Sequence, residues 1–213
     1  MGQSPGHVVE LIPGALLRAV LSRFYRFASP ICLAASRIRA GAGVRLWGFP
    51  LFAKYAGSTI EIGNRVVICS DSRFTALGVD RRSVLRTLRP GARIVIGDDV
   101  GMSGVVICAA KEVSIGSSCL FGANVTVVDT DFHPVAPSGR AHCTDWDRIA
   151  IAPVCIESNV FVGAYSLILK GVTIGENSVI GAGSVVVGNI PSNCIAAGNP
   201  CRVIRPMSQE SGF

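Results

Sequence analysis

The sequence is poor in aromatic residues, charged residues and histidine. Phe, Trp and Tyr make up 7% of the 213 residues, charged residues make up 16%, and only three histidines occur. A compact core usually contains more aromatic side chains than this. In contrast, 49% of the residues are hydrophobic and 24 are Gly, which indicates a narrow β structure that turns often. The length suits one domain with an appendage and is sufficient to bury a core.

Long apolar runs, zinc motifs and paired cysteines are also missing. No run reaches the roughly 18–20 apolar residues of a spanning helix, because the best candidate, residues 8–20, contains Glu10 and Arg18. The first ten residues lack the basic start of a signal peptide. None of the eight cysteines forms C-x-x-C and no histidine pair has zinc spacing, so we expect no metal and no disulfide framework. These absences favour a reducing compartment, the cytoplasm.

Positive charge is concentrated near the N-terminus. The whole chain has a net charge of +6, and residues 1–50 contain six Arg against one Glu, a net charge of +5. Such a region could face nucleic acid, an anionic membrane or an acidic substrate. No nucleic-acid motif accompanies the charge, so nucleic acid is not an expected partner.

Apolar residues recur every six positions in the C-terminal part of the chain. Steps of six from residue 156 meet only Ile or Val, at Ile156, Val162, Ile168, Ile174, Ile180 and Val186. A helix would need apolar residues three and four apart, and a half-buried strand would need them at every second residue. A period of six fits a solenoid coil with three flat sides, in which Ile or Val points inward and Gly eases each corner. We therefore predict stacked β coils.

Five phrases carry a resemblance to a known family. They are Gly-Ala-Asn-Val-Thr-Val at 122–127, Asp-Thr-Asp-Phe-His-Pro at 129–134, Gly-Val-Thr-Ile-Gly at 171–175, Val-Ile-Gly-Ala-Gly-Ser-Val-Val at 179–186 and Ala-Ala-Gly-Asn-Pro-Cys-Arg-Val-Ile-Arg at 196–205. Over about residues 57–206 the sequence resembles the hexapeptide-repeat acyltransferases. It is most similar to the sugar O-acetyltransferases, including the maltose and galactoside enzymes and those of bacterial surface polysaccharides.

The resemblance implies an all-β fold, a left-handed parallel β-helix with a short N-terminal helical appendage. The left hand comes from the resemblance alone, because general sterics favour right-handed crossovers. We expect a basic helical segment at residues 1–45, the β-helix domain at 46–195 with an excursion loop at 134–153, and a C-terminal tail at 196–213. The implied reaction moves an acetyl group from acetyl-CoA to a sugar hydroxyl, in surface polysaccharide biosynthesis. A homotrimer with active sites between its subunits is implied as well.

His133 is the expected general base. Histidine is the side chain best suited to proton transfer near neutral pH, and His133 stands where the regular repeat breaks. The resemblance gives this position the same role. His142 lies in the loop that follows, and its role stays open.

Three residues are expected to contact the acceptor: Asn124, Asp131 and Trp146. Asn124 matches an Asn that contacts the sugar in the galactoside enzymes, although Asn is also common at left-handed corners. Asp129 and Asp131 face the same way in extended chain, so one could orient His133 or contact the acceptor, and a solvated corner is the alternative. Trp146 could stack on a sugar ring or pack its loop down.

The resemblance also places the acyl donor. Ala164 and Ala182 match positions that contact pantetheine, and Arg202 and Arg205 match positions that contact its phosphates, where a guanidinium is well suited. The family often has Thr-Lys where this sequence has Val-Gly at 187–188, so one expected cofactor contact is missing.

A helix is predicted from Gly14 to Ala28, ended by Ser29-Pro30. Its apolar arc contains Leu16, Leu17, Val20, Leu21, Phe24 and Phe27. Two interpretations stay open. The helix could pack on the solenoid and cover the open edge of its first coil, or it could lie on the inner face of a membrane.

Other functions remain as alternatives. N-acylation of an amino sugar or another small amine uses the same solenoid, and a non-catalytic scaffold is a further alternative. Solenoid carbonic anhydrases hold zinc with three histidines, whereas only His133 and His142 lie in the repeat region here.

Overall fold

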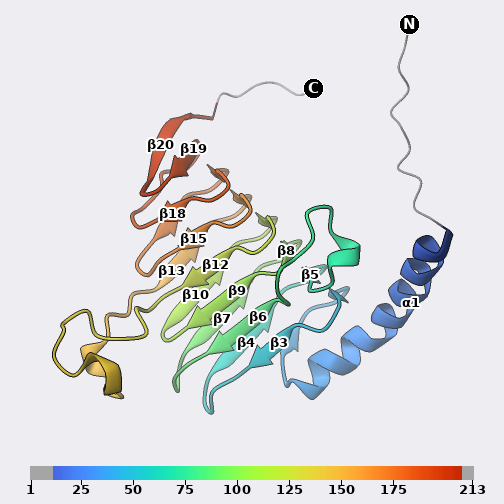
Figure 1. Cartoon of the computed structure of the whole chain (residues 1–213), viewed down its shortest axis with the longest axis horizontal. Helices are drawn as coiled ribbons and strands as arrows, with labels where there is room; N and C mark the ends of the chain where they lie inside the picture. Colours follow the sequence, from blue (N-terminus) through green and yellow to red (C-terminus); the bar gives the residue numbers. More distant parts are fainter. Residues whose placement is uncertain (1–11, 208–213) are drawn as a thin grey trace, which may run out of the picture.

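The computed structural model describes residues 12–207, which form a triangular prism of β coils with one helix at its N-terminal end (Figure 1). Each coil contributes one short strand to each of three parallel sheets. The first sheet contains β1 (Arg39–Ala40), β4 (Thr59–Ile62), β7 (Arg93–Ile96), β10 (Glu112–Ile115), β13 (Val154–Ile156) and β16 (Thr173–Ile174).

The second sheet is the longest. Its strands are β2 (Arg45–Trp47), β5 (Val67–Cys69), β8 (Gly101–Ser103), β11 (Leu120–Phe121), β14 (Phe161–Val162), β17 (Val179–Ile180), β19 (Cys194–Gly198) and β20 (Cys201–Pro206). The third sheet contains β3 (Leu51–Ala53), β6 (Val84–Thr87), β9 (Val106–Ala109), β12 (Thr126–Val128), β15 (Leu167–Ile168) and β18 (Val185–Val186). Among these strands, β20 alone runs antiparallel to its neighbour, as the second strand of a hairpin with β19.

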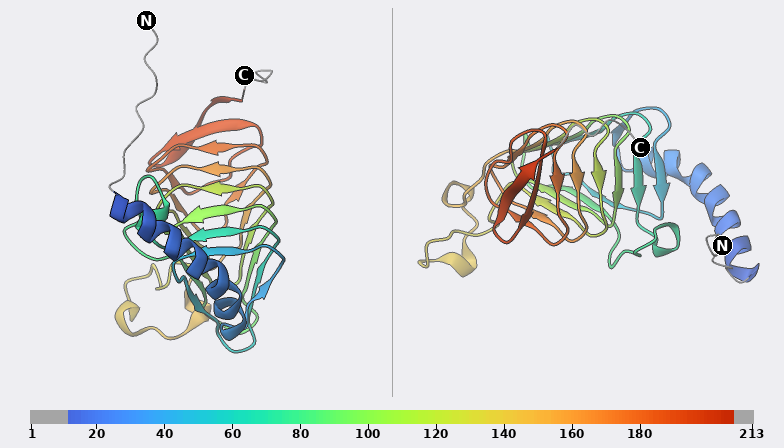
Figure 2. Two further views of the ribbon diagram at one scale, coloured as in Figure 1. Left: turned by 90° about the vertical axis from the view of Figure 1, so that its right-hand side faces the viewer. Right: turned by 90° about the horizontal axis from the view of Figure 1, so that it is seen from above.

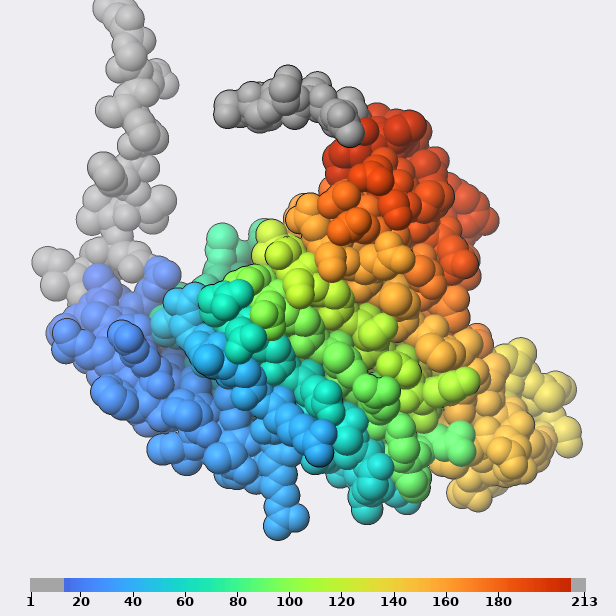
Figure 3. Space-filling view, turned by 180° about the vertical axis from the view of Figure 1, so that it is seen from behind, coloured from blue at the N-terminus to red at the C-terminus, as the bar shows by residue number. Residues whose placement is uncertain are grey.

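The six-residue repeat lies where the sequence predicts. Ile156 pairs with Ile174, Val162 with Ile180, and Ile168 with Val186, so each residue meets the one eighteen positions later. Eighteen residues are three sides of six, which confirms the three-sided coil. All six side chains are fully buried, in a core of stacked Ile, Val and Leu that runs the length of the prism. Figure 3 shows the coils as consecutive bands along this axis.

Two segments leave the regular coils at different edges of the prism. Residues 70–83 connect β5 of the second sheet to β6 of the third and include the short 3-10 helix η1 (Ser72–Phe74). Residues 129–153 connect β12 of the third sheet to β13 of the first and include η2 (Arg140–His142) and η3 (Trp146–Arg148). From the sequence, the first excursion is visible only as an interruption of the Ile-Gly pattern at 70–92.

The helix α1 (Ile12–Ala35) is longer than the sequence predicts. The expected end at Ser29-Pro30 is wrong, because Pro30 lies inside the helix. Packing against the first coil holds the chain helical there. Tyr25, Ser29 and Leu33 are buried in that contact, and the Ser29 hydroxyl accepts the N–H of Leu46 in β2 at 3.0 Å. The helix thereby covers the open edge of the second sheet.

Aromatic rings strengthen this contact. Tyr25 packs edge-on against Phe49 and Phe74, and its hydroxyl donates to Asp71 at 3.1 Å. Trp47 stacks on Phe74 with 4.7 Å between ring centroids. In residues 12–207, no helix combines the length and apolarity needed to cross a bilayer.

Candidate active site

The predicted site residues lie on two different edges of the prism. The corner between the second and third sheets, here called the Asn124 edge, carries Asn124, Ala164 and Ala182 in successive coils. The corner between the third and first sheets, here called the His133 edge, carries Asp131, His133 and Lys170. One side of the prism separates them. From Asn124 to Asp129 this side spans five residues, about 16 Å in extended chain.

Small residues bring the coils together at the Asn124 edge. A Cβ on Gly163 would lie 2.4 Å from the backbone nitrogen of Ala182, and one on Gly122 would lie 2.5 Å from that of Ala164. Between the coils, Gly183 N–H donates to the Ala164 carbonyl at 2.8 Å. The side chains of Ala164 and Ala182 therefore add little bulk to this edge, where the exposed Tyr165 stands beside Ala164.

Asn124 occupies a left-handed corner, one of the two roles considered from the sequence. Its φ of 62° is left-handed, as the corner requires. Its buried side chain binds the 70–83 excursion, because Oδ1 accepts the N–H of Asp80 at 3.1 Å and Nδ2 donates to the Asp80 carboxylate at 3.2 Å. Arg81 of the same excursion donates to the Asn124 carbonyl and to Thr126. The sequence indicates none of these contacts, which bring Asp80 and Arg81 to the candidate site.

His133 is exposed at the base of the 129–153 excursion. Its backbone N–H donates to the Asp131 carbonyl at 2.7 Å, and Asp131 N–H donates to the Ala150 carbonyl, near the end of the excursion, at 3.1 Å. The preceding residue, Phe132, has a left-handed φ of 62°. The tight turn thus holds the imidazole at the edge while leaving its ring open to solvent.

Lys170 is a candidate site residue that the sequence analysis missed. Its Nζ lies 2.6 Å from Asp131 Oδ1, and both side chains are about 30% exposed. Lys170 belongs to the next coil, so the ion pair ties the His133 segment to the prism. The sequence does contain a signal for it, because Lys170 is the only basic residue between Arg148 and Arg202.

Asp129 has a structural role. Its buried carboxylate accepts the backbone N–H groups of Ala110, Lys111 and Glu112 at 2.6–2.8 Å. Burial raises the pKa of this carboxyl above its ordinary value, and the three donors oppose that rise. The carboxylate closes the corner of the coil from which the His133 loop leaves. Asp131, two residues on, is the one that faces outward.

Trp146 lies against its own chain. The Arg89 guanidinium sits 5.4 Å from the centre of its ring, so η3 is packed on the turn between β6 and β7. His142 is exposed in η2, farther along the excursion than His133.

Arg202 and Arg205 share one face of the hairpin despite their spacing of three. The register shifts between Ile195 and Ala196, so that Arg202 pairs with Ala197 while Arg205 pairs with Ile195. The shift leaves Ile204 without a partner, which returns Arg205 to the face of Arg202. Each guanidinium donates only to a carbonyl of a neighbouring residue within the described chain. Both are therefore available to an anion.

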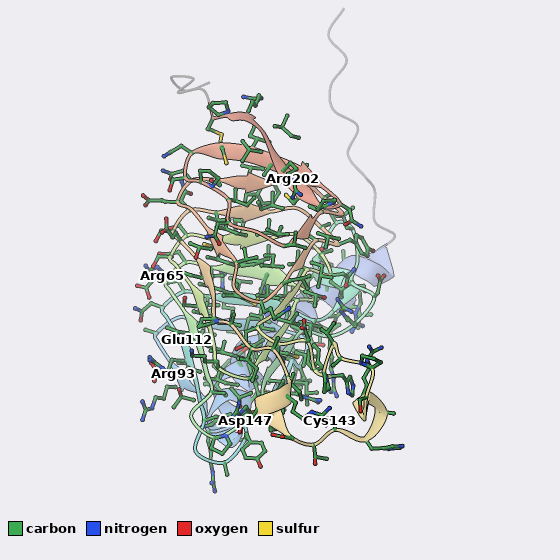
Figure 4. The ribbon with its side chains drawn as sticks, turned by 90° about the vertical axis from the view of Figure 1, so that its left-hand side faces the viewer. Arg65, Arg93, Glu112, Cys143, Asp147 and Arg202 are labelled. Carbon is green, nitrogen blue, oxygen red and sulfur yellow. The ribbon has the colours of Figure 1, made fainter. Side chains whose placement is uncertain are left out.

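Figure 4 shows Arg202 on β20 well separated from the loop that carries Cys143 and Asp147. The predicted base and the predicted donor site therefore lie on different edges of one chain. Among residues 12–207, no group of three or more His, Cys, Asp or Glu side chains could hold a metal ion.

Two segments of the chain match models of known protein families. Residues 156–188 match the family described as Bacterial transferase hexapeptide (six repeats), and residues 112–130 match the Hexapeptide repeat of succinyl-transferase. In these residues the chain contains hexapeptide repeats of the kind found in bacterial transferases. Its fold is the left-handed parallel β-helix expected from the resemblance.

Two curated relatives are galactoside O-acetyltransferases. The one from Lactococcus lactis is 44% identical over 99 residues, and the one from Escherichia coli is 46% identical over 98 residues. Each match covers 46% of this chain, and the matches cover 45% and 46% of the relatives. The chain thus spans about half the length of the curated relatives that it matches.

Solved structures extend the likeness. A galactoside acetyltransferase in complex with coenzyme A is 32% identical, with a TM-score of 0.52 over 79% of this chain and 65% of that one. AntD, an N-acyltransferase from Bacillus cereus, has a TM-score of 0.66 at 20% identity over 84% of this chain and 88% of that one, which supports the shared fold alone.

Proposed function

We propose that this hexapeptide-repeat protein is a transferase that moves an acetyl group from acetyl-CoA to a hydroxyl of a sugar. The observation that carries the proposal is His133, exposed in a turn whose neighbour Asp131 is held by Lys170. The galactoside O-acetyltransferase relatives support the reaction class and the sugar. The coenzyme A bound to a structural neighbour supports the donor.

In the proposed mechanism, neutral His133 takes the proton of the acceptor hydroxyl. The acceptor oxygen then forms a bond to the thioester carbonyl carbon, and the carbon–sulfur bond breaks. The imidazolium of His133 returns the proton to the departing thiolate, so no proton is gained or lost. Backbone N–H groups at the prism edge stabilise the oxyanion, and holding both substrates together supplies much of the remaining rate.

Direct transfer is favoured over an acyl-cysteine intermediate. Cys201 adjoins Arg202 in the proposed donor site, but it is buried, and burial raises the pKa of its thiol. A buried, protonated thiol is a poor nucleophile.

The donor site proposed is the Asn124 edge with the hairpin face. Ala164 and Ala182 leave room for the pantetheine chain, and Arg202 and Arg205 bind its phosphates from one side of β20. The acceptor contacts proposed are Asn124, Asp131 and Trp146. Because the two edges are a prism side apart, we propose a homotrimer in which His133 of one copy faces the donor site of the next.

The acceptor class proposed is a saccharide of a surface polysaccharide, acylated in the cytoplasm. The eight cysteines of the protein are all free thiols, which suits a reducing compartment such as the cytoplasm.

The histidine assignment is tested with His133→Ala and the matched variant His142→Ala. Thiol release from acetyl-CoA is followed with and without galactosides, other sugars and an amino sugar. We expect His133→Ala to lower turnover by about 10²–10⁴-fold and His142→Ala to leave it nearly unchanged. Equal effects of the two variants would refute the assignment, and release that depends on the amino sugar alone would shift the proposal to N-acylation.

The donor site is tested separately by calorimetry with coenzyme A. The double variant Arg202→Ala/Arg205→Ala should bind it at least about tenfold more weakly, because two charge-assisted contacts are lost. The control Arg82→Ala/Arg93→Ala removes the same charge elsewhere. Unchanged affinity in the first variant would remove both arginines from the site.

A further inference from the structure

The helix α1 has two faces, and the more apolar one is not the one that packs on the coils. Tyr25, Ser29 and Leu33 contact the first coil. The outer face of α1, on roughly the opposite side of the helix at 3.6 residues per turn, consists of exposed large hydrophobic side chains. These are Leu16, Leu17, Val20, Phe24, Phe27 and Ile31.

The outer face is large for a soluble surface. Phe27 is 74% exposed and Ile31 is 70% exposed. From Leu16 to Ile31 the stripe extends about 22 Å along the helix. Phe49 of the first coil, also exposed, lies edge-on to Phe24 at 6.0 Å and widens it. Figures 1 and 2 show α1 at the end of the prism away from β19 and β20, with no other described element over this face. Contiguous apolar surface of this kind marks an interaction site.

Basic residues predominate in the chain that forms and follows the outer face. Residues 11–60 contain no Asp or Glu, and their basic residues are Arg18, Arg23, Arg26, Arg37, Arg39, Arg45 and Lys54. Arg23 lies four residues before Phe27, so the two are neighbours on the helix surface. An occupant of this surface must therefore be apolar at its centre and negatively charged at its margin.

Three of these arginines line a cavity between α1 and the first coil. The cavity has a volume of about 590 Å³, and Arg23 and Arg26 of the helix and Arg45 of β2 are among its lining residues. Within residues 12–207 none of the three makes an ion pair or a side-chain hydrogen bond. One guanidinium group can donate to two phosphate oxygens at once, so the cavity suits a phosphate group.

We propose that the outer face of α1 docks the protein on an anionic phospholipid membrane, with the helix lying in the interface. Its apolar side chains enter the boundary of the acyl chains, and Arg23, Arg26 and Arg45 bind headgroup phosphates. A second copy of the chain is a poorer occupant, because the same face would bring two positively charged segments together. The inference goes beyond acetyl transfer and does not depend on it.

The apolar contact is tested by co-sedimentation with vesicles of phosphatidylcholine alone or mixed with phosphatidylglycerol. The wild type should bind the mixed vesicles and bind the neutral ones much more weakly. Phe27→Gln/Ile31→Gln should lower affinity for the mixed vesicles at least about tenfold, since two large apolar side chains are removed. The control Leu77→Gln/Leu120→Gln changes two side chains that are 72% and 55% exposed elsewhere, and it should bind like the wild type.

The charge contribution is tested with Arg23→Gln/Arg26→Gln, which should weaken binding about 30-fold at low salt. Arg82→Gln/Arg93→Gln is its control. Equal binding to both vesicle types, or equal binding by wild type and outer-face variants, would overturn the proposal. A third outcome would also overturn it: the wild type does not bind vesicles, and light scattering shows that Phe27→Gln/Ile31→Gln abolishes self-association. That outcome would identify a second copy of the chain as the occupant. Acetyl transfer to a soluble acceptor should persist in all these variants, so the outcome is separable from that of the proposed reaction.

Discussion

At each corner of the Asn124 edge, close packing between coils and the left-handed turn depend on two different residues. The Gly that follows the inward Ile or Val permits the next coil to approach closely, as at Gly163, where a Cβ would meet the Ala182 backbone. The left-handed conformation falls two residues later, at Asn124, Tyr165 and Gly183. The recurring Gly is thus required by packing between coils, and the turn itself tolerates Asn and even Tyr.

This division predicts opposite effects for two Gly→Ala substitutions. Gly163→Ala should lower the free energy of unfolding by about 1–3 kcal/mol, because the added methyl group pushes two coils apart. Gly188→Ala has open space within 4 Å and no left-handed φ, so it should be neutral or raise stability by about 0.4–1 kcal/mol. Urea denaturation of both variants measures the difference, and equal stabilities would contradict this account of the corner.

Lys170 is expected to act as a positioning residue through Asp131. Lys170→Met should lower turnover by about 10–100-fold and raise the KM of the acceptor, because the His133 turn is no longer fixed. The KM of acetyl-CoA should stay unchanged, and Lys170→Arg should recover part of the rate. Lys111→Met, at an exposed lysine on another coil, serves as control. A loss of stability without any change in these constants would show a purely structural ion pair.

At the scale of elements, α1 acts as the cap of the prism. Its Ser29 hydroxyl satisfies the Leu46 N–H at the edge of β2 and donates to the Tyr25 carbonyl at 2.6 Å. A helix interrupted at Pro30 would leave this edge open. The contact with the first coil therefore outweighs the local preference of proline for a helix end.

Removal of that hydroxyl tests the cap. Ser29→Ala leaves a buried N–H without a partner and should lower the free energy of unfolding by about 1–3 kcal/mol. Ser22→Ala, in the same helix, removes only an exposed hydrogen bond to Ala19 and should change it little. Thermal unfolding of the two variants provides the comparison, and similar midpoints would mean that α1 contributes little to closing the first coil.

At the scale of the whole molecule, the separation of the two edges makes assembly part of the proposed chemistry. If the sites form between copies, His133→Ala and Arg202→Ala/Arg205→Ala should each be impaired alone and should complement each other when co-expressed. If the two variants mix at random in a trimer, about a quarter of the sites contain both an intact His133 and an intact pair of arginines. Light scattering should give three times the 22.3 kDa of one chain. Absence of complementation in a confirmed trimer would place each site within one chain.

The sequence by itself determined the coil and its contents. The six-step series from Ile156 to Val186 specified three sides per turn and the inward side chains. Each coil packs on its neighbours through the same repeated positions, so the pattern can be recognised within a short stretch of sequence. It also marked His133 at a break in the series. The residues predicted around it stay predictions, tested by the variants above.

Only the tertiary structure decided which residues stand beside one another across coils and which surface each element shows. Lys170 meets Asp131, and Asp80 meets Asn124, through contacts between residues 39 and 44 positions apart. The shift in the hairpin register places Arg202 and Arg205 on one face, and the first coil selects the less apolar side of α1. Each depends on how distant segments pack, which no local pattern encodes. Packing also carried α1 through Pro30, where the sequence predicted its end.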